Sequence, residues 1–390
     1  MSAVTAMPRL TTREILADLI AFDTTSRNSN LPLVDYVVSY LRELGVEPLL
    51  VWNEDRTKAN LWATIGPDVP GGVILSGHTD TVPVDGQAWT SDPHVMVERD
   101  GLLYGRGTCD MKGFLASALA LVPKLAGAGL KRPVHLAFSH DEELGCIGVR
   151  SLIEHLKGSP IKAGYCLVGE PTDMRPVIGH KGGRSYRVKI RGREAHSSLA
   201  PQAVNAITYA AELIVFLDSL GERFKNGPID PLYDVTYSTL STGIIHGGTA
   251  INIVPRDCEV TFEFRYLDGV DPDAIMAEIR QMVEQRLLPR MRTVAPEAAI
   301  SFDNIYSYPN FEIDPSHQWV SSVKNLAGSN AEAKVAYGTE AGYFSGSLGI
   351  PTVVCGPGSI TEAHKPDEYV SLAQLHACDS FLEKLANQLQ

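Results

Sequence analysis

The chain has 390 residues and a formal net charge of −12, from 34 Lys and Arg against 46 Asp and Glu. This acidic balance argues against nucleic acid or an anionic membrane surface as a partner held by bulk charge. Hydrophobic residues make up 44% and charged residues 21%, which is typical of folded domains and excludes a disordered chain.

The length favours two domains, at roughly 100–200 residues per domain. The six cysteines form no CxxC pair, so neither a disulfide framework nor a thiolate zinc site is expected, and a reducing cytoplasm fits best. The first residues show no basic segment followed by an apolar run, and no apolar stretch reaches about 18 residues. We therefore expect neither secretion nor a membrane span.

Two helices are predicted at the start. Thr11 and Glu14 form a capping-box pattern before an apolar run, and a helical pattern over 31–44 ends at Gly45. Short β-type runs follow, with helical patterns between them. The β-type runs are 46–52, 59–65, 72–77, 132–139 and 163–169, and the helical patterns are 112–129 and 148–156. This alternation predicts an α/β sheet that binds ligands at the carboxyl ends of its strands.

The pattern changes near Gly182 to a β-α-β-β-α-β order. Its strands are expected at 183–192, 234–245 and 250–266 and near 297–302, with helices at 203–220 and 272–287. Helices near 316–328 and 371–389 and a strand at 351–356 then return to the α/β style. The predicted fold is a discontinuous α/β domain with a mixed sheet and flanking helices, formed by 1–181 and 304–390. A ferredoxin-like domain, 182–303, is inserted into it.

Histidine and acidic residues follow several of these strands directly. His78 and Asp80 follow one strand, the run from 140 to 143 follows another, and Glu170 follows a third, while Asp110 lies in a glycine-rich turn before a helix. Clustered carboxylates repel one another and resist burial, which a bound cation would relieve. Imidazole and carboxylate together suit zinc, manganese or cobalt, and a shared carboxylate can bridge two ions.

Each of these features has a simpler explanation when it stands alone. The His78 and Asp80 pair could be an ordinary hydrogen-bonded pair, acids often begin helices, and Glu170 could be a turn residue before Pro171. The turn at 105–113 is not a phosphate loop, because no GK[ST] follows it. Their joint occurrence favours the metal site.

Six motifs together resemble a dinuclear-zinc metallopeptidase and deacylase family over nearly the whole chain. They are SGHTDTVP at 76–83, GRGTCDMKG at 105–113, SHDEELG at 139–145, VGEPT at 168–172, REAHSSLAPQAVNAI at 193–207 and AHKPDEYV at 363–370. The resemblance implies two divalent ions, zinc first, with cobalt and manganese also compatible. The implied ligands are His78, Asp110 and Glu170 for one ion, and Asp110, Glu143 and His364 for the other, with Asp110 bridging and followed by a cis peptide.

The resemblance also assigns roles around the ions. Glu142 is the expected general base, and Asp80 is expected to hold the imidazole of His78 in its metal-binding tautomer. His196 of the inserted domain is expected to stabilise the oxyanion, often from the partner subunit. Without the motif, His196 would be an ordinary loop histidine.

Arg265 and Asn252 are expected on a strand of the inserted domain, in contact with the substrate carboxylate. The alternative for Arg265 is an ion pair with Glu263. The run YGTEAGYFS at 337–345 is similar to members that deacetylate N-acetyl-L-ornithine, where Glu340 would meet the δ-ammonium group. The alternative for Glu340 is an acid at a helix N-terminus.

The expected function is metal-dependent removal of acetate from N2-acetyl-L-ornithine in arginine biosynthesis. A related deacylase acting on N-succinyl-diaminopimelate, N-acetylcitrulline or an N-formyl amino acid stays open, as do a dipeptidase and a non-catalytic binding protein. A small N-acyl amino acid is the expected partner. The resemblance also implies a homodimer through the inserted domain, which is expected to act as a lid and has two strands that could end as exposed edges.

Overall fold

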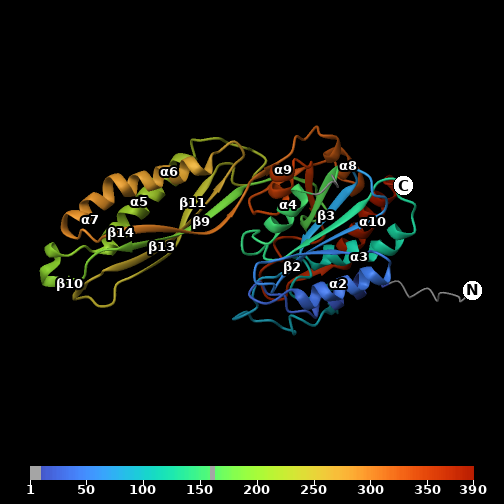
Figure 1. Ribbon diagram of the computed structural model, residues 1–390, viewed down its shortest axis with the longest axis horizontal. Coiled ribbons are helices and arrows are strands. Elements are labelled where there is room, and N and C mark those ends of the chain that lie inside the picture. The colour runs from blue at the N-terminus through green and yellow to red at the C-terminus, as the bar shows by residue number, and fades with distance from the viewer. Residues whose placement is uncertain (1–9, 159–162) are drawn as a thin grey trace, which may run out of the picture. The chain divides into compact units, whose positions relative to one another are not determined.

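The computed structural model describes residues 10–158 and 163–390, which divide into two compact units (Figure 1). The large unit comprises the described residues up to Gly179 together with Phe311–Lys334 and Thr339–Gln390, and the small unit comprises His180–Asn310 and Val335–Gly338. Residues 1–9, on which part of the expectation about secretion rests, lie outside the described residues.

A nine-stranded mixed sheet forms the centre of the large unit. Strands β3, β6, β7 and β17 run parallel, whereas β1 and β2 add to one side in antiparallel pairing. The strands in sheet order are β1 (Leu49–Trp52), β2 (Ala59–Ile65), β6 (Val134–Ser139), β3 (Val73–His78), β7 (Tyr165–Pro171), β17 (Thr352–Gly356), β8 (Val177–His180) and β15 (Phe311–Glu312), with β16 (Ala333–Val335) paired to β8. The predicted mixed α/β sheet is confirmed.

Helices cover both faces of this sheet. A side chain at Gly77 of β3 would meet Met111 and Leu115, at and just after the start of α3, whereas the neighbouring Ser76 bonds to Glu340 at the start of α9. Because successive residues of a strand point to opposite faces, α3 and α9 lie on opposite sides of the sheet. The helices are α1 (Thr12–Ile20), α2 (Leu31–Glu43), α3 (Lys112–Ala126), α4 (Val149–Lys157), α8 (Gln318–Ala327), α9 (Ala341–Leu348) and α10 (Leu372–Gln388). Helix α1 begins with the predicted capping box.

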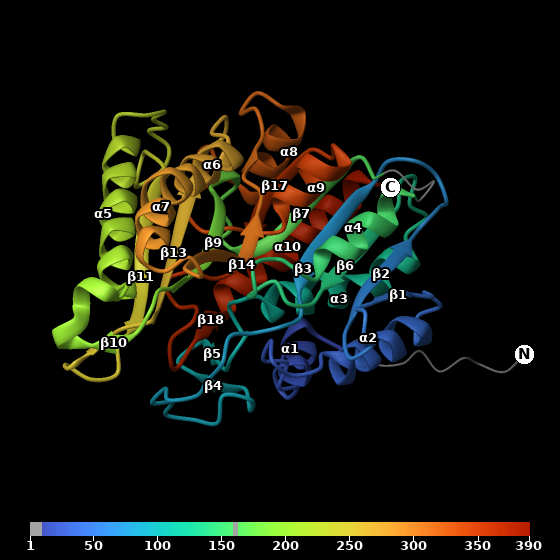
Figure 2. The ribbon, with the colours of Figure 1, turned by 60° about the vertical axis from the view of Figure 1, so that its left-hand side comes forward.

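A small antiparallel sheet in the large unit has no counterpart among the predicted strands. Strand β5 (Leu102–Tyr104) pairs with both β4 (Val97–Arg99) and β18 (Tyr369–Ser371), as Figure 2 shows. The glycine-rich turn with Asp110 follows β5, and His364 precedes β18. This sheet therefore brings the two loops together although 254 positions separate them (364 − 110).

The small unit is built on a four-stranded antiparallel sheet in the order β11-β13-β9-β14. Helices α5 and α6 cover one face of it, and their apolar side chains share a core with β9 and β13 (Figure 1). The elements in chain order are β9 (Gly182–Arg191), β10 (Ala195–His196), a 3₁₀ turn (Ser197–Gln202), α5 (Ala206–Phe224), β11 (Thr239–Gly247), β12 (Ile253–Val254), β13 (Asp257–Tyr266), α6 (Pro272–Met282), α7 (Leu288–Val294) and β14 (Ala299–Tyr308). The main elements follow the order β-α-β-β-α-β.

Three details differ from the predicted elements. The main segment of the small unit runs to Asn310, beyond the expected end at 303, because β14 pairs with β9 as far as Tyr308. The helix expected over 272–287 ends at Met282 and continues as a π-helical turn, Val283–Leu287, where the missing N–H of Pro289 interrupts the regular bonding. The strand expected over 250–266 is divided at Pro255, which cannot donate a ladder bond.

No helix in the described ranges 10–158 and 163–390 combines the length and hydropathy that crossing a bilayer requires. All six cysteines are buried and free.

Candidate metal centre

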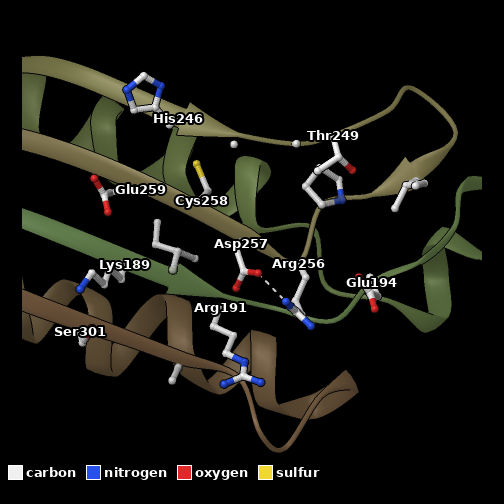
Figure 3. A pocket seen from close by; sticks show the side chains of 16 residues that line it. Lys189, Arg191, Glu194, His246, Thr249, Arg256, Asp257, Cys258, Glu259 and Ser301 are labelled. Atoms are coloured by element: carbon white, nitrogen blue, oxygen red, sulfur yellow. Dashed lines mark hydrogen bonds and ion pairs between the residues drawn. The ribbon is translucent and has the colours of Figure 1, made fainter.

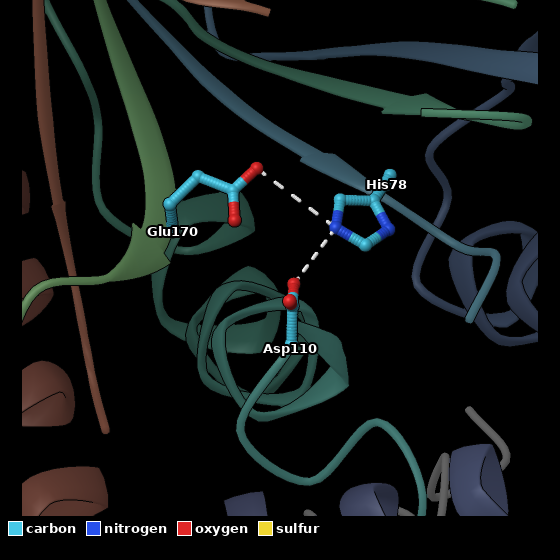
Figure 4. Close-up of side chains that lie close together, drawn as sticks. All are labelled: His78, Asp110 and Glu170. Carbon is cyan, nitrogen blue, oxygen red and sulfur yellow. Dashed lines mark hydrogen bonds and ion pairs between the residues drawn. The ribbon is translucent and has the colours of Figure 1, made fainter. Parts of the chain in front are cut away.

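Three side chains converge at the carboxyl edge of the large sheet (Figure 4). Nε2 of His78 lies 3.0 Å from Oδ1 of Asp110 and 3.8 Å from Oε1 of Glu170. All three residues are buried, with exposed fractions of 1%, 6% and 4%. Their ligand atoms lie within 4.8 Å of one another, so the group could hold a metal ion.

A second group of the same kind shares Asp110. Its other oxygen, Oδ2, lies 3.3 Å from Nε2 of His364, which in turn lies 3.1 Å from Oε2 of Glu143. These ligand atoms also lie within 4.8 Å of one another. Asp110 thus directs one oxygen into each group, which is the arrangement of a carboxylate that bridges two ions.

Neighbouring parallel strands explain this convergence. Strand β3 ends at His78, and β7, which pairs with it directly, carries Glu170 near its own end. Strand β6 pairs with β3 on the other side, and the chain leaves it toward Glu143. Parallel strands end at the same edge of a sheet, so the predicted meeting of these side chains is observed.

The charges at this edge are poorly balanced. Five carboxyl groups and two imidazoles gather here: Asp80, Asp110, Glu142, Glu143, Glu170, His78 and His364. Burial, together with the charge of Asp110, raises the pKa of Glu170 well above its usual range. Burial and the neighbouring carboxylates also raise the pKa of Glu142 to about 8, against the opposing effect of His78.

The two histidines offset only part of this charge. Hydrogen bonds to Asp110 and Glu143 raise the pKa of His364 to about 11. Burial lowers the pKa of His78, but Asp110 and Glu170 outweigh that effect and hold it well above the ordinary value. Burial would raise the pKa of Asp110, yet its bonds to both histidines hold it low. Divalent cations would relieve the remaining repulsion, and these nitrogen and oxygen donors fit such ions.

Glu142 lies next to both groups without belonging to either. Its backbone N–H donates to Oδ1 of Asp80 at 3.1 Å, and that of Glu143 donates to Oδ2 of Asp80 at 3.3 Å. Cys146 donates through its sulfur to Oε1 of Glu142 at 3.2 Å. Asp80 therefore fixes the backbone that carries both glutamates.

The contact between Asp80 and His78 differs from the predicted one. Nδ1 of His78 lies 2.9 Å from the main-chain carbonyl oxygen of Asp80, whereas the carboxylate is 3.6 Å away. The carboxylate is occupied by the N–H groups of the two glutamates, so the carbonyl takes its place. Because a carbonyl oxygen can only accept, Nδ1 carries the proton, and Nε2 is directed at Asp110 and Glu170.

Glu340 lies in the large unit and is only 1% exposed. It is the N-cap residue of α9, in line with the alternative of an acid at a helix start. Its carboxylate accepts hydrogen bonds from Ser76 of β3 and Ser139 of β6. Burial raises its pKa.

The remaining predicted site residues belong to the small unit. His196 is exposed and lies 2.8 Å from the hydroxyl of Ser198 through Nδ1. Asn252 lies in the turn immediately before β12 and not on a strand as predicted. Its carbonyl oxygen accepts from the N–H of Ser197, which places it beside His196.

Arg265 is on β13, as predicted. Nε contacts Glu263 at 3.3 Å, and Nη1 donates to the hydroxyl of Tyr308 and the carbonyl oxygen of Ala336, at 3.2 and 3.1 Å. The contact with Glu263 is the alternative considered for this arginine. Nη2 takes no part in these bonds.

The small unit also contains a hollow of about 720 Å³, shown in Figure 3. Both signs of charge line it, with Lys189 and Arg191 on β9 and Glu259 on β13. None of the residues of the two candidate metal groups lines this hollow.

The chain matches the model of one protein family, peptidase family M20/M25/M40, over residues 74–388. The chain belongs to this family. Two relatives, both named acetylornithine deacetylase, align with the chain over almost their whole length. The Photorhabdus laumondii protein is 34% identical, and the alignment covers 93% of this chain and 91% of that protein. The Pectobacterium carotovorum protein is 36% identical, and the alignment covers 90% of this chain and 88% of that protein.

Solved structures share the fold of this M20/M25/M40 chain. An M20 family metallo-carboxypeptidase from Sulfolobus solfataricus aligns with a TM-score of 0.79 at 19% identity, over 96% of this chain and 98% of its own. The YXEP protein of Bacillus subtilis, described as a dinuclear metal-binding peptidase, aligns with a TM-score of 0.67 at 17% identity, over 97% of each chain. The chain is a hydrolase, and its family and metal groups support amide hydrolysis that depends on two divalent metal ions.

Glu368 and Arg106 are absent from the predicted site residues, although both lie within the motifs that carry the family resemblance. Both are almost fully buried, at 0% and 1% exposure, and they form an ion pair. The sequence alone does not reveal this ion pair, because Arg106 and Glu368 lie in loops that are far apart in the chain and meet only in the folded structure.

Proposed function

We propose that the protein removes the acetyl group from N2-acetyl-L-ornithine to give L-ornithine, a step of arginine biosynthesis, with zinc as the resident ion. The observation that carries the proposal is Asp110 shared between two ligand groups with Glu142 beside both. Relatives named acetylornithine deacetylase over about nine-tenths of the chain support the choice of substrate.

In this proposal, His78, Asp110 and Glu170 hold one ion, and Asp110, Glu143 and His364 hold the other. When bound, the two ions supply a water of lowered pKa and polarise the amide carbonyl. Glu142 takes the proton from the attacking water and returns it to the nitrogen of the leaving amine. Because Oε1 of Glu142 accepts from Cys146, we assign the proton to Oε2.

Residues of the small unit bind and orient the substrate in this proposal. Arg265 offers Nη2 to the substrate carboxylate, since its other donors are engaged within the unit. His196 donates to the oxyanion that develops on the carbonyl. The main-chain oxygen of Asn252 accepts from the N–H of Ser197, the residue after His196, and the side-chain amide of Asn252 contributes a further contact to the substrate.

A panel of substrates tests the reaction class and the substrate separately. We expect kcat/KM for N-acetyl-L-ornithine to exceed that for N-succinyl-diaminopimelate, N-acetylcitrulline, an N-formyl amino acid and a dipeptide by about 10-fold or more. Preference for another N-acyl amino acid would contradict the substrate and leave the amide hydrolase in place. Preference for the dipeptide would make the protein a peptidase.

Glu340 is proposed to attract the δ-ammonium of ornithine with a charge that no arginine or lysine neutralises among the described residues. Glu340→Gln is then expected to raise KM for N-acetyl-L-ornithine by about 10–100-fold, the loss of one charge-assisted contact. KM for N-acetyl-L-norvaline, whose side chain carries no charge, should stay unchanged. Equal losses for both substrates would instead indicate that Glu340 only ties β3 and β6 together through Ser76 and Ser139.

We also propose a homodimer formed through the small unit. Strand β11 is an edge of its sheet, and Ile244 and Ile245 on it are 49% and 47% exposed. An exposed apolar edge strand is a ready site for pairing with a second copy.

Replacing both isoleucines with lysine is expected to raise the dimer dissociation constant by about 10²–10⁴-fold, since each buried isoleucine contributes about 1.5–3 kcal/mol. Sedimentation velocity at micromolar protein would show the shift from dimer to monomer. Val215→Lys, on the exposed face of α5, is the matched control because Val215 is 69% exposed but lies off the edge strand. A monomeric unmodified protein would contradict the dimer.

A further inference from the structure

The two ligand groups are held by different kinds of structure. His78 and Glu170 lie on β3 and β7, whose backbones are hydrogen-bonded to each other. His364 instead lies in a turn, with a positive φ of 63° and a side chain that is 50% exposed. The sheet therefore fixes the first group, whereas the second depends on what holds the loop of His364.

A buried carboxylate holds the loop of Asp110. Oε1 of Glu368 accepts from the backbone N–H groups of Gly107, Cys109 and Asp110, at 3.0, 2.9 and 3.0 Å. Three N–H groups that converge on one oxygen leave this turn little freedom, because a shift of the turn would break a charge-assisted bond in a dry environment. Glu368 thereby sets the position of the shared aspartate.

The carboxylate of Glu368 is also connected to the loop of His364 through a series of hydrogen bonds. Oε2 of Glu368 accepts from Nη1 of Arg106 at 2.6 Å, and Nη2 of Arg106 donates to Oε1 of Gln87 at 2.5 Å. The amide nitrogen of Gln87 then donates to the main-chain carbonyl oxygen of His364 at 3.0 Å. Gln87, Arg106 and Glu368 form one chain of bonds between the two loops, which we call the loop-coupling network.

Trp89 contacts two members of this network, Gln87 and Arg106. Its indole N–H donates to Oε1 of Gln87 at 3.0 Å, and its ring lies 5.0 Å from the guanidinium carbon of Arg106. A cation over an aromatic ring is attracted to it, so the guanidinium is held against both partners. None of these residues supplies a ligand atom to either group.

We infer that Gln87, Arg106 and Glu368 are positioning residues that set the metal affinity of the Asp110, Glu143 and His364 group more than that of the His78, Asp110 and Glu170 group. The inference rests on the proposed function, in which each group holds one ion. Partners that orient a ligand typically contribute 10–100-fold in metal affinity. The effect falls on the second group because the bond from Gln87 reaches the backbone of His364 and no residue of the sheet.

Gln87→Met gives the sharpest test. It keeps the length of the side chain but removes the donor to His364 and the acceptor for Arg106, in a partly exposed loop. Gln318→Met is the matched control, because Gln318 also donates a single bond, to the hydroxyl of Tyr165, but on α8 away from the network. Glu368→Gln is a second variant that keeps the shape of the central carboxylate.

The experiment is a calorimetric titration of chelator-stripped full-length protein with Zn²⁺. The unmodified protein is expected to bind two ions, and His364→Ala identifies which binding step belongs to the second group. Gln87→Met should weaken that step by about 10–100-fold and leave the other step and the Gln318→Met titration unchanged. Glu368→Gln should weaken the same step more than the other, since the first group depends on Glu368 only through the shared Asp110.

Failure of the two proposals gives different results. Two normal steps in Gln87→Met, or equal weakening of both steps, would overturn the positioning inference while the metal sites stand. Fewer than two ions on the unmodified protein would instead overturn the two-ion proposal on which the inference rests.

Discussion

Replacing Glu142 with alanine is expected to lower kcat for N-acetyl-L-ornithine by about 10²–10⁴-fold, the usual contribution of a general base. Glu142 lies beside both ligand groups but is a member of neither, and the carboxylate of Asp80, which is also not a ligand, is occupied by the backbone N–H groups of Glu142 and Glu143. The measurement is steady-state release of free amine, together with metal content by atomic emission. Metal content should remain at two ions.

Glu142→Gln separates the base from the shape of its side chain, because the amide fills the same space and cannot accept the proton. It should lose as much activity as Glu142→Ala. Glu154→Gln is the control for an exposed glutamate, which pairs with Lys157 on the surface of α4. Retention of more than a tenth of kcat in Glu142→Gln would contradict the role of general base.

Asp110→Ala is expected to remove both metal ions together, because each ion loses one oxygen of the shared carboxylate. Activity should fall by about 10²–10³-fold or more, since a polarising ion contributes several kcal/mol to the transition state. Glu170→Ala removes a ligand from only one group, so it should retain close to one ion. Metal content after dialysis distinguishes these results.

The control for Asp110→Ala is Asp303→Ala, which removes an exposed aspartate paired with Lys189 in the small unit. It should keep both ions and full activity. Two retained ions in Asp110→Ala would show that the aspartate does not bridge. A loss of both ions in Glu170→Ala would indicate strongly cooperative binding in place of two separately held ions.

Much of the large sheet and its candidate metal site could be predicted because short apolar β-type runs end in histidine and acidic residues. His78 and Glu170 lie at strand ends, and the parallel order of β3 and β7 brings them together without any further information. The motifs singled out Glu143 within the run 140–143 and added His364, which the strand pattern alone does not connect. The metal groups were therefore accessible from local patterns together with the family resemblance.

Contacts between distant loops were not accessible in the same way. The pairing of β5 with β18 joins segments of three residues each, which are too short for a pattern to predict a strand, so the network through Glu368 and Gln87 has no local signature. The contact of Asp80 with the backbone of Glu142 and Glu143 likewise depends on a loop that turns back at Asp141, where φ is 53°. Positive φ at a residue other than glycine is hard to predict from neighbours alone.

The burial of Glu340 is a further example. Its position before a helix follows from the sequence, but its bonds to Ser76 and Ser139 require the sheet to be assembled first. Hydrogen-bond partners that are brought together only by tertiary packing could therefore not be predicted from patterns in this single sequence.

The most direct test of the central claim is the rate of amine release from N-acetyl-L-ornithine by chelator-stripped protein, before and after Zn²⁺ or Co²⁺ is added. We expect turnover to be absent after stripping, to return with about two ions per chain, and not to return in Glu142→Ala. Full turnover in the stripped protein, or restored turnover in Glu142→Ala, would contradict metal-dependent hydrolysis with Glu142 as the base.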